Sequence, residues 1–170
     1  MESISENKIT IRKSTHADIN DIADIYVKAR EFMRKSGNPT QWADGYPTDI
    51  DVTRDIENGT GYVGVNRKGD IVMAFAFIVG DDPTYNVIED GQWLDNELYG
   101  TIHRLGSDGT IGGVFQTCVD FCSSIIGNLR LDTHRDNKPM LGAVSKLGFT
   151  RCGIIYCRDG SPRIAFQKRF

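Results

Sequence analysis

Three titratable side chains have residue types and positions suited to acid–base chemistry. His103 lies in the run 101–105 (TIHRL), which alternates as a strand, and imidazole exchanges protons near neutral pH. Glu97 directly precedes this run and is the rival general base, whereas Tyr156, in the run 153–156 (GIIY), is the candidate general acid. Each residue also has a purely structural interpretation. His103 could be hydrogen-bonded within a half-buried sheet, Glu97 could be a solvated loop carboxylate, and Tyr156 could be a sheet aromatic that packs against a helix.

A glycine-rich turn follows the same strand and could bind an anion. Residues 106–113 lead into an apolar stretch at 111–127 that predicts a helix. Free N–H groups at a helix start favour a phosphate or pyrophosphate. The turn has neither the Gly-Lys-Ser/Thr of a Walker loop nor a G-x-G-x-x-G fingerprint, which argues against a nucleotide-binding oxidoreductase. A tight connection that binds nothing is the alternative.

Charged residues are distributed unevenly along the chain. The net charge is -3, from 20 basic and 23 acidic residues, which disfavours non-specific nucleic-acid binding. Residues 129–170 hold nine Lys or Arg against three Asp, whereas residues 81–98 hold six acidic residues and no basic one. These segments are either solvated loops and edges or two faces, one for an anionic ligand and one for a cationic ligand.

Cysteines and large aromatic residues give weaker signals. The four cysteines, at 118, 122, 152 and 157, match neither a zinc knuckle nor a C-x-x-C pair, so no metal site is expected, and the first two fit an apolar helical stripe. Three large aromatics fall in predicted loops, where they either fold over the core or border a ligand. They are Trp42, Tyr46 and Trp93.

The surrounding pattern predicts one mixed α/β domain over residues 1–170. The 39% hydrophobic and 25% charged composition suits a folded domain of this length. No apolar run reaches the ~18 residues of a membrane span, and the N-terminus MESISENK fits neither a signal nor a transit peptide, so we expect a cytoplasmic protein. Strands are expected at 8–12, 61–65, 71–79, 99–105, 129–133, 153–158 and 163–168, with helices after Thr15 and Thr48 and at 111–127 and 137–147.

The C-terminal motifs resemble the GNAT superfamily of acetyl-CoA-dependent N-acetyltransferases. The strand at 129–133, followed by Asn137, Lys146, Gly148 and Phe149, matches the family's strand–Asn–helix–Gly-Phe pattern. The expected element order also fits over essentially the whole chain. The resemblance implies an α/β (α+β) fold, with a mixed, mostly antiparallel sheet flanked by helices and a splayed central strand pair.

The resemblance also implies where acetyl-CoA, the co-substrate, binds. Its pantetheine arm pairs with the strand at 99–105, around Arg104 and Leu105, and contacts Asn137. Its pyrophosphate lies on the turn that follows, at Gly109, Thr110, Ile111, Gly112 and Gly113. The segment after the first helix and the loop before the central strand border the acceptor pocket, which Trp42, Tyr46 and Trp93 could line.

Two positions depart from the family's pattern. The family's pyrophosphate loop is commonly Arg/Gln-x-x-Gly-x-Gly/Ala, but residues 107–112 read SDGTIG, with Thr110 in place of the first glycine. Many members carry a general-acid Tyr four residues before the helix-ending glycine, and here that position is Val144. The general acid must therefore be another group, for which Tyr156 is the candidate.

Together these observations predict an N-acetyltransferase that transfers acetyl from acetyl-CoA to a primary amine by direct attack in a ternary complex. An amine with a pKa of about 10.4 is neutral only about once in 2,500 at pH 7, so a base such as His103 has a role. The acidic segment favours a cationic acceptor. A non-catalytic acyl-CoA-binding module or sensor is the alternative, and we expect a monomer or homodimer with no nucleic-acid, membrane or metal partner.

Overall fold

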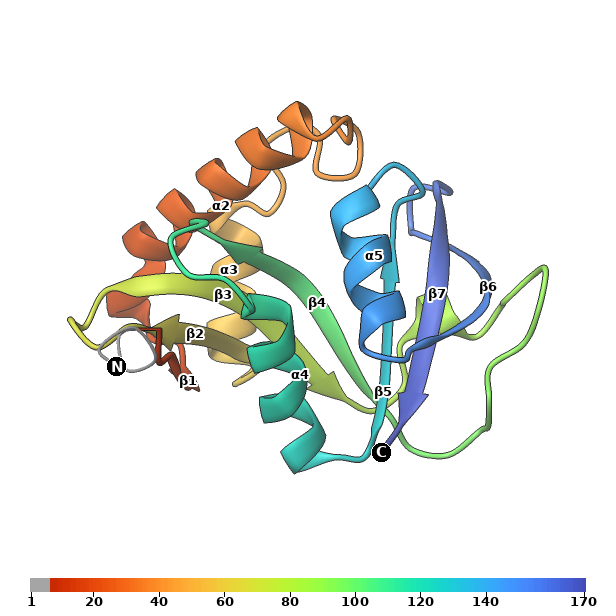
Figure 1. Ribbon diagram of the computed structural model, residues 1–170. Helices are drawn as coiled ribbons and strands as arrows, with labels where there is room; N and C mark the ends of the chain where they lie inside the picture. The colour runs from red at the N-terminus through yellow and green to blue at the C-terminus, as the bar shows by residue number, and fades with distance from the viewer. Residues whose placement is uncertain (1–6) are drawn as a thin grey trace.

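The computed structural model describes residues 7–170, which build one seven-stranded sheet with helices on both faces (Figure 1). The strand order is β1-β2-β3-β4-β5-β7-β6, and every neighbouring pair is antiparallel except β4–β5. The strands are β1 (Thr10–Lys13), β2 (Gly61–Val65), β3 (Ile71–Val79), β4 (Gly100–Ser107), β5 (Asn128–Thr133), β6 (Thr150–Tyr156) and β7 (Pro162–Arg169). The helices are η1 (His16–Asp18), α2 (Ile19–Lys35), α3 (Asp49–Glu57), η2 (Pro83–Tyr85), α4 (Val114–Ile125) and α5 (Lys138–Lys146).

Alternation along the strands sends side chains into separate cores on the two faces. On β7, Phe166 packs in the cluster that α4 and α5 cover, whereas its neighbour Ala165 packs with Tyr85 and Tyr99 under the segment 81–98. Over β2 and β3, the face opposite α4 is covered by α2 and α3. The second face therefore has two separate covers, α2 with α3 over β2 and β3 and the segment 81–98 over β7.

Strands β4 and β5 separate soon after they meet. They pair only at Gly100–Leu129 and Thr101–Arg130, and beyond these residues the two ribbons diverge (Figure 1). The splayed central pair, and with it the predicted fold class, is thereby confirmed. The edge of β4 that faces β5 is left without ladder partners from residue 102 onward.

A bulge in β4 turns its backbone beside the gap between the separated strands β4 and β5, which we call the opening. The register with β3 slips opposite Phe75, and Arg104 adopts a left-handed φ of 54°. Such a conformation strains a non-glycine residue, so it must be held by its surroundings. The Tyr26 hydroxyl donates to the Arg104 carbonyl at 2.8 Å, and the guanidinium donates twice to Asp55 of α3, at 2.6 and 3.0 Å.

The loop between α2 and α3 contacts the end of β5. The Gln41 amide oxygen accepts from Asn38 at 2.8 Å within the loop and from the Asn137 amide at 3.2 Å across the opening. The Thr133 hydroxyl at the end of β5 lies 3.4 Å from the same oxygen. One amide oxygen therefore links the loop to both β5 and the start of α5.

Several boundaries differ from the sequence-based prediction. Helix α4 begins at Val114 rather than near residue 111, because Gly113 has a left-handed φ of 72° and serves as the N-cap. Strand β4 continues to Ser107, since Gly106 and Ser107 still pair with β3. The segment 81–98 contains η2 and an antiparallel bridge from Glu89 to Ile154 of β6, so it is more ordered than the expected loop.

Within residues 7–170, no helix combines the length and the apolar character needed to cross a bilayer. The prediction about a targeting leader rested on the N-terminus, of which residues 1–6 lie outside the described part of the chain. Likewise, residues 7–170 contain no group of three or more His, Cys, Asp or Glu side chains arranged to hold a metal ion.

The ion pair behind the bulge provides a stability test. Asp55 and Arg104 have side chains only 12% and 17% exposed, so removing the carboxylate leaves a guanidinium charge without its partner in a desolvated site. We expect Asp55→Ala to lower the free energy of unfolding by about 3 kcal/mol. Asp24→Ala, on the exposed side of α2, should change it by less than about 0.5 kcal/mol in the same urea titration, and equal effects of the two variants would contradict this account.

Candidate active site

His103 lies on β4 just past the point where β4 and β5 separate. Its side chain points to the second face, is 22% exposed, and places Nε2 3.0 Å from Oδ2 of Asp82. Asp82 is 17% exposed and belongs to the acidic segment 81–98. A half-buried imidazole with a carboxylate partner beside an opening is a suitable arrangement for proton transfer.

Several donors fix the Asp82 carboxylate. Oδ1 accepts from the Thr84 backbone N–H at 2.9 Å and from the Thr84 hydroxyl at 2.7 Å, while the Asp82 N–H donates to the Tyr99 hydroxyl at 2.7 Å. Burial raises the pKa of Asp82, but the hydrogen bonds from His103 and Thr84 outweigh it and lower the pKa to about 2. Asp82 is therefore ionised throughout the neutral range and accepts from His103 as a carboxylate.

Tyr85 of η2 reaches β5, on the other side of the opening from His103. The Tyr85 hydroxyl donates to Oδ2 of Asp132 on β5 at 2.7 Å, and its ring centroid lies 6.4 Å from that of His103. Burial and the neighbouring Asp132 raise the pKa of Tyr85 well above its usual value. Tyr85 therefore keeps its proton and connects the His103 side of the opening to β5.

The three aromatic residues predicted to line the acceptor pocket lie in two different parts of the structure. Trp42 packs edge-on against Tyr26 at 5.5 Å and Tyr46 at 6.3 Å, and the Tyr46 hydroxyl accepts from Arg104 at 3.3 Å. These residues lie on the β4 side of the opening. Trp93 instead donates from Nε1 to the Tyr85 carbonyl, and the Arg130 guanidinium lies 4.1 Å from its ring centroid, so this ring already has a cation partner.

The other two acid–base candidates lie away from His103. Tyr156 is on the edge strand β6, which β7 separates from β5, and its hydroxyl donates to Glu89, which raises the pKa of Tyr156. This placement argues against the general-acid role predicted for Tyr156. Glu97 is exposed, and its N–H donates to Asp95 near the closed end of the β4–β5 pair, before the strands have separated.

The glycine turn between β4 and α4 is open to ligands. A Cβ atom placed on Gly109, Gly112 or Gly113 would meet nothing within 4 Å, and no side chain caps the α4 N-terminus. The backbone of Ile111 to Gly113 could therefore hold a pyrophosphate. However, Oδ1 of Asp108 accepts from both the N–H and the hydroxyl of Thr110, which places a carboxylate in the turn itself.

Asn137 caps α5 and already has partners for most of its polar atoms. Oδ1 accepts from the Met140 N–H at 3.3 Å, while Nδ2 donates to Gln41 at 3.2 Å and to Thr133 at 3.1 Å. One lone pair of Oδ1 is left for a pantetheine amide. For Asn137 to donate a hydrogen bond to a ligand, its contact with Gln41 or with Thr133 would have to open.

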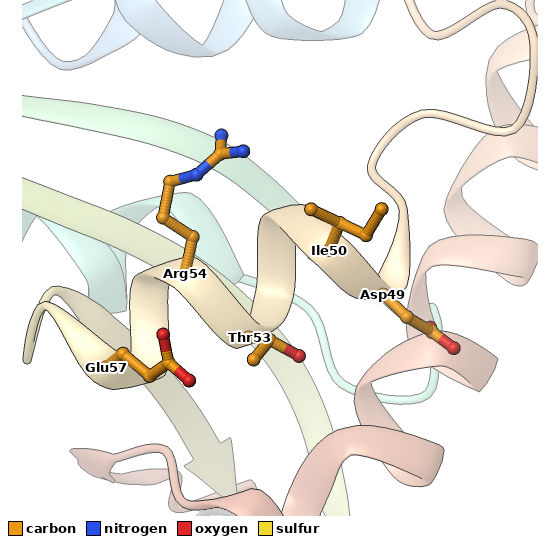
Figure 2. Close-up of a pocket in the computed structure, with 5 residues that line it drawn as sticks. All are labelled: Asp49, Ile50, Thr53, Arg54 and Glu57. Atoms are coloured by element: carbon orange, nitrogen blue, oxygen red, sulfur yellow. The ribbon is translucent and has the colours of Figure 1, made fainter.

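A shallow depression elsewhere on the surface is not a competing site. It has a volume of about 340 Å³ and lies on the outer side of α3 (Figure 2). A single helix supplies all of its walls, and no imidazole or carboxylate pair faces another element there. Its lining residues are Asp49, Ile50, Thr53, Arg54 and Glu57.

Two residues of the opening carry roles that sequence reasoning missed. Asp82 is one of six acidic residues in its segment, and only the Asp-x-Thr spacing to Thr84 indicates a structured carboxylate. Gln41 has no sequence signal for its contacts with Asn137, which is 96 residues away.

Comparison with known proteins gives the family. No family model matches the chain, and no curated protein does. Among solved structures, a GNAT-family acetyltransferase from Streptococcus agalactiae superposes with a TM-score of 0.84 and 33% identity, covering 95% of both chains. GNAT-family acetyltransferases from Listeria monocytogenes (TM-score 0.71, 20% identity, 95% of both chains) and Bacillus cereus (TM-score 0.60, 15% identity, 95% of this chain and 97% of that one) share the fold.

The similarity to the streptococcal protein extends over nearly the full length of both chains, and the separated β4–β5 pair occupies the centre of this sheet. This chain belongs to the GNAT family of acetyltransferases.

Proposed function

We propose that this protein is an N-acetyltransferase that transfers the acetyl group of acetyl-CoA directly to a primary amine bound in the same ternary complex. The observation that carries the proposal is the separation of β4 from β5, which leaves one edge of β4 unpaired and places His103 beside it. We treat residues 1–170 as a single acetyltransferase domain, since one sheet contains all seven strands.

Acetyl-CoA would enter along β4. The unpaired edge from residue 102 offers backbone partners for the amides of pantetheine, with Arg104 and Leu105 at the bulge. The turn at Gly109–Gly113, including Thr110 and Ile111, would hold the pyrophosphate at the α4 N-terminus. Asn137 would contact the pantetheine arm from α5.

The chemical step follows from these positions. The amine nitrogen bonds to the acetyl carbonyl carbon, the carbon–sulfur bond breaks, and sulfur leaves with the electron pair as the CoA thiolate. His103 takes the proton that the amine loses, directly or through water, and the thiolate then takes a proton from solvent. Glu97 is the less favoured base because it lies at the closed end of the strand pair.

Direct transfer agrees with the state of the cysteines. Cys118 and Cys122 are fully buried in the α4 core, and burial raises the pKa of Cys118, Cys152 and Cys157. Since the nucleophile of a cysteine is its thiolate, raised pKa values disfavour a covalent acetyl-enzyme.

A cationic amine is the acceptor that the local charges favour. The Arg104 charge is neutralised by Asp55, and the Arg130 guanidinium is covered by the rings of Trp93 and Tyr99. Asp82 and Asp132 lie on the same side of the sheet, next to His103 and Tyr85. The rest of the acidic segment contributes less than its sequence predicts, because three of its carboxylates have partners outside the opening. Glu89 accepts from Tyr156, Asp90 pairs with Arg151, and Asp95 pairs with Arg169.

The Asp108 carboxylate favours a second candidate, a GNAT-like module that binds acyl-CoA weakly as a sensor and does not turn it over. Its negative charge lies in the turn where the pyrophosphate would bind, and like charges oppose each other there. The two candidates share the cofactor site and differ in whether any amine is acetylated.

The glycine turn provides a binding test. We expect calorimetry to detect CoA binding, Gly112→Asp to weaken it at least about fivefold, and Asp108→Asn to tighten it roughly threefold, because both changes alter charge at a helix start. Gly112→Ala is the matched control: a Cβ at this position meets nothing within 4 Å, so folding and binding should be retained. A native protein that bound neither CoA nor any short acyl-CoA would exclude both candidates.

The base assignment predicts a kinetic defect. His103→Ala should lower kcat/KM for acetyl transfer by about 10²–10⁴-fold, and the acid limb of the pH–rate profile should flatten, because the proposed base is gone. The measurement is CoA release followed over a range of pH. A variant that kept the native profile would assign the proton transfer to another group.

The carboxylates beside His103 and Tyr85 predict the acceptor class. A polyamine or a lysine-containing peptide should have a higher kcat/KM than an acidic amine, and added salt should lower this kcat/KM because it screens the attraction. Competition between the two acceptor types at several ionic strengths measures both effects. Preferential acetylation of the acidic amine would show that Asp82 and Asp132 do not attract the acceptor.

A further inference from the structure

The hydrogen bond between His103 and Asp82 has a defined direction. Asp82 is a carboxylate and has only acceptor atoms, so the hydrogen that joins the two residues belongs to Nε2 of His103. In the neutral imidazole one nitrogen carries the hydrogen and the other accepts. Neutral His103 therefore has a lone pair on Nδ1.

No other contact competes for His103 within residues 7–170. The charged and titratable groups around it are Asp82, Tyr85 and Tyr99. Asp132 lies beyond Tyr85, Arg130 lies over the Tyr99 ring, and the neutralised Arg104 is next along β4. The Tyr85 hydroxyl donates to Asp132, and the Tyr99 hydroxyl accepts from the Asp82 N–H. Neither hydroxyl is hydrogen-bonded to Nδ1 of His103. This nitrogen is left for a substrate or a water molecule.

We propose that Asp82 is a positioning residue that fixes His103 in the tautomer protonated at Nε2, so that Nδ1 is the atom that accepts the proton of the attacking amine. The proposal rests on the acetyltransferase function proposed above. The proton moves from the amine nitrogen to Nδ1 while the nitrogen–carbon bond forms and the carbon–sulfur bond breaks. The resulting imidazolium stays hydrogen-bonded to the Asp82 carboxylate, which stabilises its charge.

The anchoring of Asp82 makes one substitution unusually informative. Oδ1 faces two donors from Thr84, so the amide introduced by Asp82→Asn must keep its oxygen there. Its NH₂ group then takes the place of Oδ2 and donates to Nε2 of His103, which moves the imidazole hydrogen to Nδ1. The variant keeps the size and the hydrogen bonds of the native residue and reverses the tautomer.

The experiment combines NMR spectroscopy of the imidazole nitrogens with steady-state kinetics. In the native protein, long-range proton–nitrogen spectra should show His103 protonated at Nε2, with its signals assigned by their loss in His103→Ala. In Asp82→Asn the hydrogen should move to Nδ1, and kcat should fall by about 10²–10⁴-fold with KM within about threefold. Thermal unfolding of the variant checks that the fold is retained.

Asp90→Asn is the matched control. It removes the same charge from the same segment, at an exposed residue whose partner is Arg151, and asparagine tolerates its left-handed φ of 55°. It should leave the tautomer and the kinetics unchanged. A structural role limited to holding the segment predicts a loss of stability in Asp82→Asn with kcat preserved.

Two results would overturn the positioning role: a native His103 protonated at Nδ1, or Asp82→Asn with a native rate. The first needs no variant, so a folding defect cannot obscure it. In an active enzyme either result leaves the acetyltransferase function intact. A native protein that binds CoA and has the Nε2 tautomer, yet acetylates no amine, would instead overturn the proposed function and the base role of Nδ1 with it.

Discussion

The brief pairing of β4 with β5 is the constraint on which the rest of the structure depends. Two paired residues on each strand join the halves of the sheet, and beyond Thr101 the edge of β4 that faces β5 has no strand beside it, while the other edge stays paired with β3. Unpaired backbone groups are costly when buried and useful when a ligand can pair with them. The surrounding elements must therefore hold β4 and β5 apart, and the unpaired edge of β4 must remain accessible.

Three sets of contacts meet this requirement from different elements. Tyr26 and Asp55 hold the bulge at Arg104 from α2 and α3, Gln41 joins the loop after α2 to the tip of β5, and Tyr85 connects η2 to Asp132. Each contact is polar and directional, so it sets the distance between the elements that it joins more definitely than apolar packing would. The apolar cluster beneath α4 and α5 packs residues of both halves together, and these polar bonds add fixed distances on either side of the gap between β4 and β5.

The sequence contains most of the fold and only part of the site. Periodicity and caps are local properties, which is why the order of strands and helices and the position of His103 on β4 could be predicted. The partners of the site residues are distant in sequence: 21 residues separate Asp82 from His103, and 49 separate Asp55 from Arg104. Tyr156 shows the converse, since its motif spacing is suitable while the strand order places β7 between it and the opening.

The hydrogen bond between His103 and Asp82 contributes to folding as well as to the proposed proton transfer. The pKa of Asp82 is lowered from 3.8 to about 2, so its contacts with His103 and Thr84 together stabilise the folded state above pH 4, and this contribution is lost as the pH falls toward 2. A pKa lowered by this amount corresponds to about 2 kcal/mol in the free energy of unfolding. Imidazoles exchange protons near neutrality, where Asp82 stays ionised. Since Nε2–H donates to Asp82 in both the neutral and the protonated imidazole, the segment 81–98 stays attached to β4 while Nδ1 gains and loses its proton.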